Sequence, residues 1–285
     1  MIGPWRTDTG SPWSTKPNTG THISLCMSGN ERSNRPVTTT ETSFRILELL
    51  KANGGSSLAA LAEELDMARS TVHRHLLTLE TNDLVGRENG EYYLGLRFLD
   101  FGMRARDRLD FYHVARPLVD RLAAETDEKV WLVAKDGRFS VHLYKAYGDN
   151  PLETSARVGQ RRHLHQLAAG KAILSRLPDE EVRDILDCCG LPEQTEHTIT
   201  DRDELLGELD GIGERGYAFN RGESITGLNA VGAPIRDADG YPVGAISISG
   251  PANRVKGGLL REELPDKLLA AIDEIHIHLR YASDG

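Results

Sequence analysis

Hydrogen-bonding side chains are concentrated on one predicted helix, residues 68–79. Its apolar residues Val72, Leu76 and Leu79 recur at spacings of four and three, so they form one stripe along the helix. The polar side chains lie on its other faces: Arg69, Ser70, Thr71, His73 and Arg74. Hydroxyl, imidazole and guanidinium groups are suited to the base edges and phosphates of a DNA major groove. The pattern predicts a DNA-contacting helix, and the alternative is a helical hairpin whose polar face meets only solvent.

The elements before this helix fit a helix-turn-helix. Residues 57–65 predict a short helix capped by Ser57, and only three residues separate it from the next helix. Residues 38–41 have a capping-box sequence, which predicts a first helix that ends at Asn53-Gly54-Gly55. On that first helix we expect one face to carry Phe44, Leu47 and Leu50.

A β-hairpin is predicted directly after the third helix. Residues 84–87 and 91–94 flank Glu88-Asn89-Gly90, and Asn-Gly is the strongest short signal for a hairpin turn. Three helices followed by a hairpin make a winged helix-turn-helix. Near the tip of the hairpin, Arg87 would meet phosphate or the minor groove.

The length of 285 residues favours two domains with separate cores. We expect a disordered tail over residues 1–37, a winged helix-turn-helix over 38–95, a linker helix over 96–111 and a second domain over 112–285. The tail is rich in Gly, Pro, Ser, Thr and Asn, and Met27 is a candidate for the true start of the protein.

Composition excludes several classes of protein. A net charge of −9 argues against a protein that coats nucleic acid through a global positive field, although it allows local DNA contacts. Three cysteines make no disulfide framework, which favours a cytoplasmic location. The apolar runs are too short for a membrane span, so we expect no membrane association through one.

The second domain shows an α+β alternation with an antiparallel sheet. Helices are predicted over 112–126, 166–177, 179–189, 201–215 and 260–281, with Thr200 as the cap of the fourth. Strands are predicted over 130–134, 141–144, 152–158, 228–235 and 241–249. Residues 159–165 are expected to form a loop rich in Arg and His.

Linked motifs in one order resemble the IclR family of transcriptional regulators. In the winged domain they are Ser70-Thr-Val-His-Arg74 and Leu77-Thr-Leu79. In the second domain they are Val158-Gly159, Leu164-His165, Ala168, Gly170-Lys-Ala172, Gly216-Tyr-Ala218, Glu223, Gly227-Leu228, Ala233-Pro234 and Ser247-Ile-Ser-Gly-Pro251. The resemblance covers about residues 38–283 and implies a GAF-like or profilin-like domain that binds a small-molecule effector.

What the resemblance implies is a regulator that binds a double-stranded DNA operator as a homodimer or homotetramer and controls a catabolic operon, for sugars or organic acids. Carried over position by position, the effector site comprises Gly159, Gln160, Asn220, Leu228, Ala230, Ser247 and Ser249. The chain departs from the family at four positions, where the family often has Pro, Thr, Asp and Cys: His163, Leu167, Asn220 and Ala230. Without a carboxylate, Asn220 would favour a more anionic effector.

Rival functions find less support. His163 and His165 lack an evident third ligand, so we expect no metal site and no cofactor. The sequence has no nucleophile elbow, no phosphate-binding loop and no helical zinc motif, which argues against an enzyme. A small-molecule sensor with little DNA specificity, or a DNA-architectural protein, are the alternatives that remain.

Overall fold

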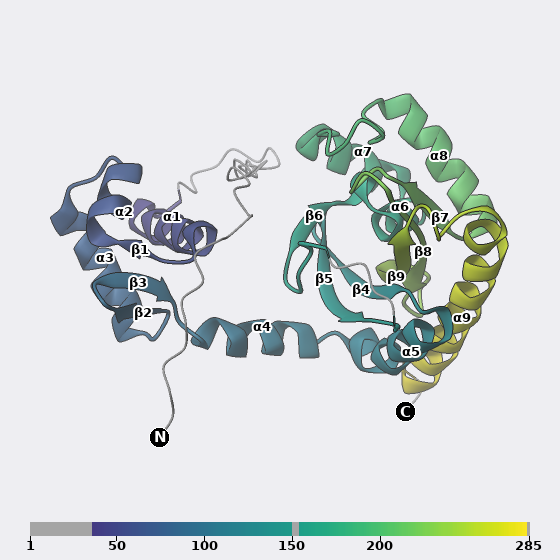
Figure 1. Cartoon of the computed structure of the whole chain (residues 1–285), viewed down its shortest axis with the longest axis horizontal. Helices are drawn as coiled ribbons and strands as arrows, with labels where there is room; N and C mark the ends of the chain where they lie inside the picture. The colour runs from purple at the N-terminus through teal and green to yellow at the C-terminus, as the bar shows by residue number, and fades with distance from the viewer. Residues whose placement is uncertain (1–35, 150–153, 284–285) are drawn as a thin grey trace, which may run out of the picture. The chain divides into compact units, whose positions relative to one another are not determined.

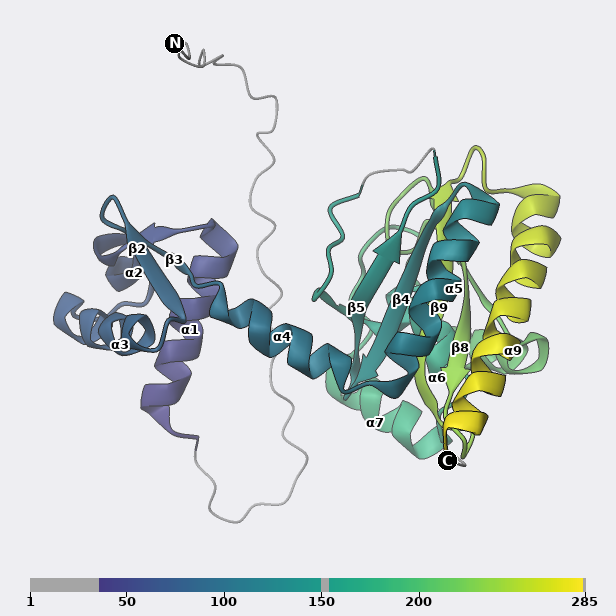
Figure 2. The same cartoon turned by 90° about the horizontal axis from the view of Figure 1, so that it is seen from below.

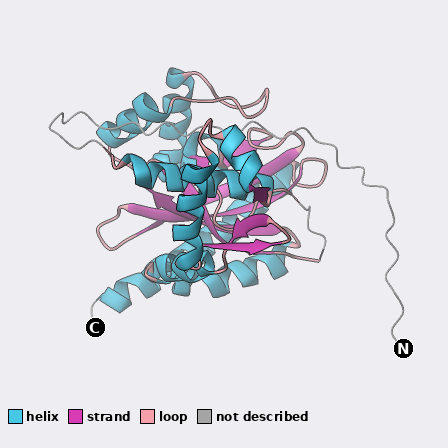
Figure 3. Cartoon of the chain, turned by 90° about the vertical axis from the view of Figure 1, so that its left-hand side faces the viewer, coloured by secondary structure: helices cyan, strands magenta, loops and turns pink. Residues whose placement is uncertain are grey.

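The computed structural model describes residues 36–149 and 154–283. The chain divides into two compact units between Phe98 and Leu99 (Figure 1). Figure 3 shows the helices and strands of the chain, the mixed composition expected of an α+β protein. The predicted tail and the Met27 start lie outside the described residues, except for Pro36 and Val37.

The first unit is a winged helix-turn-helix. Its elements are α1 (Thr38–Asn53), β1 (Ser56–Ser57), α2 (Leu58–Glu64), α3 (Arg69–Thr81), β2 (Val85–Glu88) and β3 (Glu91–Leu94). The strands form an antiparallel sheet in the order β1-β3-β2. As predicted, Ser57 caps α2, and its Oγ accepts a hydrogen bond from the backbone N–H of Ala60. Asn89 and Gly90 both have positive φ, the backbone of a two-residue hairpin turn.

Two details of α1 differ from the sequence-based expectation. The capping box is wrong, because Val37 occupies the N-cap position and no side chain caps the helix. Thr38 is already helical, so its hydroxyl cannot fill the cap role. Phe44 is 63% exposed, while Ile46 and Leu50 point into the core at a spacing of four. The short strand β1, which pairs with β3, was not predicted.

The predicted linker helix is present as α4 (Arg97–Asp107), shorter at both ends than the pattern suggested. None of its residues is buried, and Leu99, Phe101 and Met103 are exposed apolar residues on it.

The second unit is built on one six-stranded antiparallel sheet. Its order is β6-β5-β4-β9-β8-β7. The strands are β4 (Lys129–Asp136), β5 (Phe139–Ala146), β6 (Arg161–His163), β7 (Ala218–Arg221), β8 (Leu228–Arg236) and β9 (Pro242–Pro251). The central strands β4, β9 and β8 pair along most of their length and form the middle of the sheet.

Helices cover both faces of this sheet (Figure 2). One face packs against α5 (Asp110–Thr126) and α9 (Leu264–Ser283), which also contact each other. A π-helical turn, Leu259–Glu263, leads into α9. The other face packs against α6 (Ala168–Leu174), beyond which lie α7 (Asp179–Cys189) and α8 (Arg202–Arg215). Alternate strand residues supply the two cores: Ile246 and Ile248 face α5 and α9, and Ala245 faces α6.

The sheet edges are where the predictions fail. The strand predicted over 152–158 is wrong for its described residues, which form no strand from Thr154 onward. The edge strand is instead β6, in the predicted Arg- and His-rich loop, because its backbone pairs with β5. Strand β7 was not predicted.

Two helices of the second unit also differ from the prediction. The predicted helix 166–177 is only α6, preceded by the 3₁₀ turn Leu164–Gln166. Helix α8 is capped by Asp201 instead of Thr200.

Candidate DNA-contacting surface and effector site

Helix α3 is held in the first unit by one apolar stripe. Val72, Leu76 and Leu79 are buried in the core with residues of α1 and α2. A side-chain hydrogen bond also joins α3 to α1, since Ser43 Oγ lies 2.9 Å from His75 Nδ1. The opposite face of α3 is therefore fixed in orientation and open to solvent.

The residues predicted to contact DNA lie on this open face and on the wing. Arg69, Ser70, His73 and Arg74 are exposed, and Thr71 is half-buried. Arg87 is exposed on β2, with its guanidinium 5.2 Å from the centre of the Tyr92 ring. Within residues 36–149 and 154–283, no carboxylate forms an ion pair with Arg69, Arg74 or Arg87. Their positive charges are thus available to phosphates.

The α3 surface also contains a residue that hydrogen-bonding chemistry does not flag. Leu77 is 53% exposed, one turn beyond His73 and Arg74. An exposed leucine on a polar helix face can contact a thymine methyl group in the major groove. Leu77 directly follows the buried Leu76, so it lies outside the apolar stripe of α3, and this position in the helical pattern could have identified it as exposed.

In the second unit, the predicted effector residues share one sheet face. Asn220 on β7, Ala230 on β8 and Ser249 on β9 are register neighbours, and Lys129 on β4 continues the same row. Ser247 occupies the next row, between Gly232 and Trp131. All face α6, the opposite side from α5 and α9. The spacing of two between the serines thus places both on this face, as predicted.

Leu228 and Ala230 form the apolar part of this face. They pack with Ala168, the first residue of α6, and with the partly buried Ile225. Gly232 allows α6 to approach the sheet, because a Cβ there would lie 2.5 Å from the backbone nitrogen of Ala169.

The loop residues Gly159 and Gln160 reach the sheet through His142 on β5. The N–H of Gly159 donates to the His142 carbonyl at 2.8 Å, and the N–H of His142 donates to the Gln160 carbonyl at 3.1 Å. The His142 ring lies edge-on against Trp131, with 4.4 Å between ring centres. Trp131 in turn neighbours Ser247, so loop and strand residues lie on the same face.

Hydrogen bonds already occupy some of these polar groups. Asn220 is buried; its Nδ2 donates to the Gln166 carbonyl at 2.7 Å, and its Oδ1 accepts from the N–H of Glu223 at 3.1 Å. The hydroxyl of Ser249 donates to the Lys129 carbonyl at 3.4 Å. Ser247, also buried, has no hydrogen-bond partner for its hydroxyl among the residues that the structure describes. Ser247 is therefore the serine of this pair that can bind a ligand without losing a bond.

Ionisable groups around this face are strongly perturbed. Burial lowers the pKa of His142 to about 4, and it also lowers the pKa of His165 to about 4. Both rings are therefore neutral at pH 7. Burial lowers the pKa of Arg162 as well, and one of its buried guanidinium nitrogens, Nη2, has no hydrogen-bond partner.

A buried ion pair lies behind the Asn220 turn. Lys171 on α6 is almost fully buried, and its Nζ lies 2.6 Å from Glu223 Oε2 and 4.0 Å from Glu208 Oε1. Burial raises the pKa of Glu223, while the charge of Lys171 opposes that rise. As predicted, Gly170 and Lys171 are helical, so they do not form a phosphate-binding loop. Sequence reasoning identified neither the Lys171–Glu223 pair nor the Trp131–His142 contact, because their partners are distant in the chain.

Metal-ligating side chains do not gather at the His-rich segment. The rings of His163 and His165 lie 5.8 Å apart. Throughout residues 36–149 and 154–283, no three His, Cys, Asp or Glu side chains are grouped so that they could hold a metal ion. Over the same residues, no helix is both long and apolar enough to cross a bilayer.

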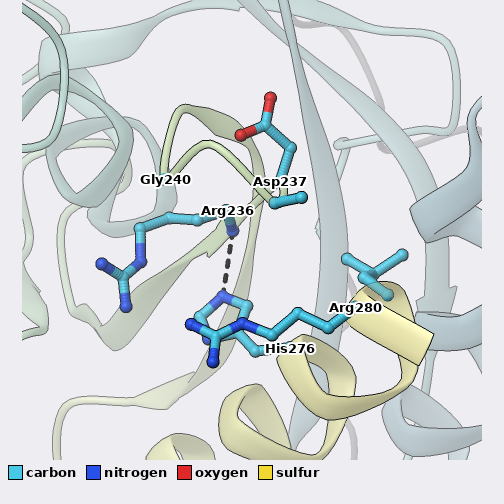
Figure 4. A pocket seen from close by; sticks show the side chains of 7 residues that line it. Arg236, Asp237, Gly240, His276 and Arg280 are labelled. Atoms are coloured by element: carbon cyan, nitrogen blue, oxygen red, sulfur yellow. Dashed lines mark hydrogen bonds between the residues drawn. The ribbon is translucent and has the colours of Figure 1, made fainter. Parts of the chain in front are cut away.

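A small hollow lies elsewhere in the second unit (Figure 4). Its lining comes from the end of β8, the β8–β9 turn and α9: Arg236, Asp237, Ala238, Gly240, His276, Leu279 and Arg280. This hollow lies at the Arg236 end of β8, whereas Leu228 is the first residue of that strand and Ser247 pairs with Gly232 at its middle.

Comparison with known protein families agrees with both units. The family described as bacterial transcriptional regulator IclR C-terminal matches residues 103–277, and the winged helix-turn-helix DNA-binding family matches residues 39–85. The first of these matches spans more than half of the chain. The chain therefore belongs to the IclR family of transcriptional regulators.

Individual relatives agree with this assignment. The HTH-type transcriptional regulator KipR of Bacillus subtilis is 33% identical over 209 residues, which cover 73% of this chain and 84% of KipR. The crystal structure of Thermotoga maritima IclR is 32% identical, with a TM-score of 0.71, over 85% of this chain and 98% of that one. A Microbacterium hydrocarbonoxydans IclR homolog, crystallised with 4-hydroxybenzoate, shares the fold at 22% identity and a TM-score of 0.74, covering 85% and 99% of the two chains. Proteins of this family are regulators of transcription and not enzymes.

Proposed function

We propose that the protein is a sequence-specific regulator whose binding to a DNA operator is controlled by a small metabolite bound in its second unit. The target is a catabolic operon for a sugar or an organic acid. The protein acts in the cytoplasm as a homodimer or homotetramer, since paired half-sites multiply the specificity of one short recognition helix.

DNA binding is assigned to the open face of α3 and to the wing. Ser70, Thr71 and His73 contact base edges, Arg69 and Arg74 contact bases or phosphates, and Arg87 contacts the backbone at the wing. The observation that supports this assignment is the absence of carboxylate partners for the three arginines within the described residues.

Effector binding is assigned to the α6-facing side of the sheet. The observation that carries it is the row of neighbours from β7 to β4, with Ser247 beside it and a hydroxyl that lacks a partner within the described residues. Ser247 and the Gly159–Gln160 loop hold the polar end of the ligand, and Leu228 and Ala230 contact its apolar part. The Microbacterium homolog carries an aromatic carboxylate, which is one ligand class to test.

Control of DNA binding by the effector requires linkage. A ligand shifts an equilibrium only by binding two arrangements of the oligomer with different affinities. Effector binding favours one of these arrangements, and the two differ in the spacing between the DNA half-sites that the oligomer can contact. The effector promotes DNA binding if the favoured arrangement fits the operator, and it releases DNA if the other arrangement fits.

The test separates the two sites. Chromatin occupancy in the native cells, with different carbon sources, identifies the operator and the effector class. Fluorescence anisotropy on that operator then compares Arg74→Ala with Ser247→Ala. We expect Arg74→Ala to weaken operator affinity about tenfold or more, the loss of one good contact, with unchanged effector affinity, and Ser247→Ala to do the reverse. Unchanged operator affinity in Arg74→Ala would refute the placement of the recognition helix.

A further inference from the structure

The hollow at the β8–β9 turn has the size of one small chemical group. Its volume is about 40 Å³, room for roughly three water molecules. Pockets for whole metabolites are several times larger, on the order of 300 Å³ or more. This hollow can thus enclose a single compact group, with any larger molecule extending into solvent.

Two arginines from distant parts of the chain line the hollow. Arg236 ends β8, and Arg280 lies near the end of α9. Figure 4 shows the Arg280 side chain passing over His276, with its guanidinium on the same side as that of Arg236. Burial lowers the pKa of the His276 ring, and the nearby charges of Arg236 and Arg280 lower it further. Neither arginine forms an ion pair with any residue that the structure describes.

Two carboxylates lie near these arginines, and neither forms an ion pair with them among the residues that the structure describes. Asp237 lines the hollow, but its Oδ1 accepts hydrogen bonds from the N–H groups of Asp239 and Tyr241, at 3.0 and 2.8 Å, and so belongs to the turn. Asp273 is exposed on α9, and its charge partly opposes the lowering of the His276 pKa. It forms no ion pair with Arg236 or Arg280.

A third arginine lies close enough to Arg236 for the two charges to interact. Arg176 follows α6, and burial lowers its pKa, as does the charge of Arg236. Its Nε is buried without a hydrogen-bond partner. Like charges repel, so an anion beside Arg236 would relieve the repulsion between Arg236 and Arg176.

The base of the site is fixed by His276. Its Nε2 accepts a hydrogen bond from the backbone N–H of Arg236 at 3.0 Å. A nitrogen that accepts carries no proton, so the neutral ring is protonated on Nδ1. This bond ties the end of β8 to α9 and holds the backbones of the two arginine-bearing segments together.

We propose that this hollow is a binding site for one oxyanion group, a phosphate or a carboxylate, held by Arg236 and Arg280. A guanidinium presents paired N–H donors that match either group, and two of them enclose it from two elements. The site is distinct from the proposed effector residues, because Ser247 pairs with Gly232, four residue steps of β8 before Arg236 and about 13 Å along the strand.

Inorganic phosphate is the first probe, added to the full-length protein in chloride buffer at constant ionic strength. Isothermal titration measures its affinity for the wild type, Arg280→Gln and Arg183→Gln. Arg280 lies on an exposed helix surface, so its replacement leaves the core intact. Arg183→Gln removes the same charge from an exposed side chain of α7, which pairs with Asp179 at 3.8 Å, and is the control.

We expect saturable one-site binding in the wild type and in Arg183→Gln, and at least tenfold weaker binding in Arg280→Gln. Arg236→Gln should weaken binding equally, since the bond to His276 uses its backbone and is kept. Ser247→Ala should bind phosphate as the wild type does, which separates this site from the effector site. Equal affinity in Arg280→Gln and Arg183→Gln would overturn the proposal.

Acetate and glycerol phosphate distinguish the sources of the group. Tighter binding of glycerol phosphate than of inorganic phosphate identifies a phosphorylated metabolite, and saturation by acetate alone identifies a carboxylate ligand. Absence of saturable binding by all three probes would refute the site.

Discussion

Asn220 and Gln166, 54 residues apart in the chain, are joined by a hydrogen bond of 2.7 Å from the Asn220 side-chain amide to the Gln166 carbonyl oxygen. This bond ties β7 to the turn that leads into α6. Because Asn220 is 1% exposed, water cannot replace the bond if it is lost. The amide therefore has a structural role, in addition to its place on the proposed effector face.

Asn220→Asp is expected to destabilise the protein by about 1–3 kcal/mol, the cost of an unsatisfied buried polar group. An ionised carboxylate would face the Gln166 carbonyl with no proton to donate, while the bond from the Glu223 N–H could persist. Urea unfolding at pH 7 measures the loss. At lower pH the carboxyl group regains a proton, so the difference in the free energy of unfolding between the variant and the wild type should become smaller. A variant as stable as the wild type at pH 7 would contradict this role.

Buried neutral histidines predict a loss of stability in mild acid. The pKa of His142 is about 4 in the folded protein because of burial, compared with about 6.5 when unfolded. Between these values the unfolded chain binds more protons, so the free energy of unfolding falls as pH drops from about 6.5 to 4, by on the order of 3 kcal/mol. The contribution is fully present above pH 6.5.

His142→Asn should reduce this pH dependence, because Asn has no charge to gain. His165, whose pKa is also about 4, still contributes to the pH dependence in this variant. The slope of the free energy of unfolding against pH should therefore decrease without vanishing. His73→Asn changes an exposed histidine and is the control. Urea midpoints at half-unit steps of pH give the slope, and identical slopes in His142→Asn and the wild type would show that His142 does not carry this effect.

The parts of the fold that could be predicted depend on local pattern. The α3 stripe of Val72, Leu76 and Leu79 has a helical period, and Asn89-Gly90 has the backbone preference of a hairpin turn. The shared face of Ser247 and Ser249 follows from strand alternation alone. In each case the residues that decide the structure lie within a few positions of one another.

What could not be predicted depends on partners far along the chain. Strand β6 forms because β5 offers a free edge to Arg161–His163, and no feature within those three residues selects it over residues 152–158. Arg236 and Arg280 share a hollow only because the end of β8 packs beside α9. The identity of a site residue was accessible from family resemblance, but its hydrogen-bond partner was not.

The buried Lys171–Glu223 pair should be costly to break from one side. Lys171→Met leaves the Glu223 carboxylate buried without its counter-charge, and we expect a loss of about 3–5 kcal/mol. The pKa of Glu223, already raised by burial, should rise further without the charge of Lys171. The double variant Lys171→Met/Glu223→Gln removes both charges and should recover part of the loss. Thermal and urea unfolding of the four proteins complete the cycle.

An exposed pair provides the comparison. Lys51 and Glu48 on α1 form an ion pair at 2.6 Å, with side chains 50% and 72% exposed, and breaking it should cost less than about 1 kcal/mol. If the Lys171→Met and Glu223→Gln losses simply add in the double variant, the two charges do not interact and the pair has no structural role.

Two helical glycines should respond in opposite directions to the same substitution. A Cβ at Gly170 in α6 would contact the carbonyl oxygen of Leu164, in the turn before the helix. That backbone cannot yield as a side chain can, so Gly170→Ala is expected to destabilise by about 1–3 kcal/mol through overpacking. A Cβ at Gly207 in α8 meets no atom within 4 Å. Gly207→Ala should therefore stabilise by about 0.4–1 kcal/mol, because alanine restricts the unfolded chain. Urea unfolding of both variants measures the difference, and a stabilised Gly170→Ala would mean that α6 and the Leu164 turn are packed less closely than the backbone indicates.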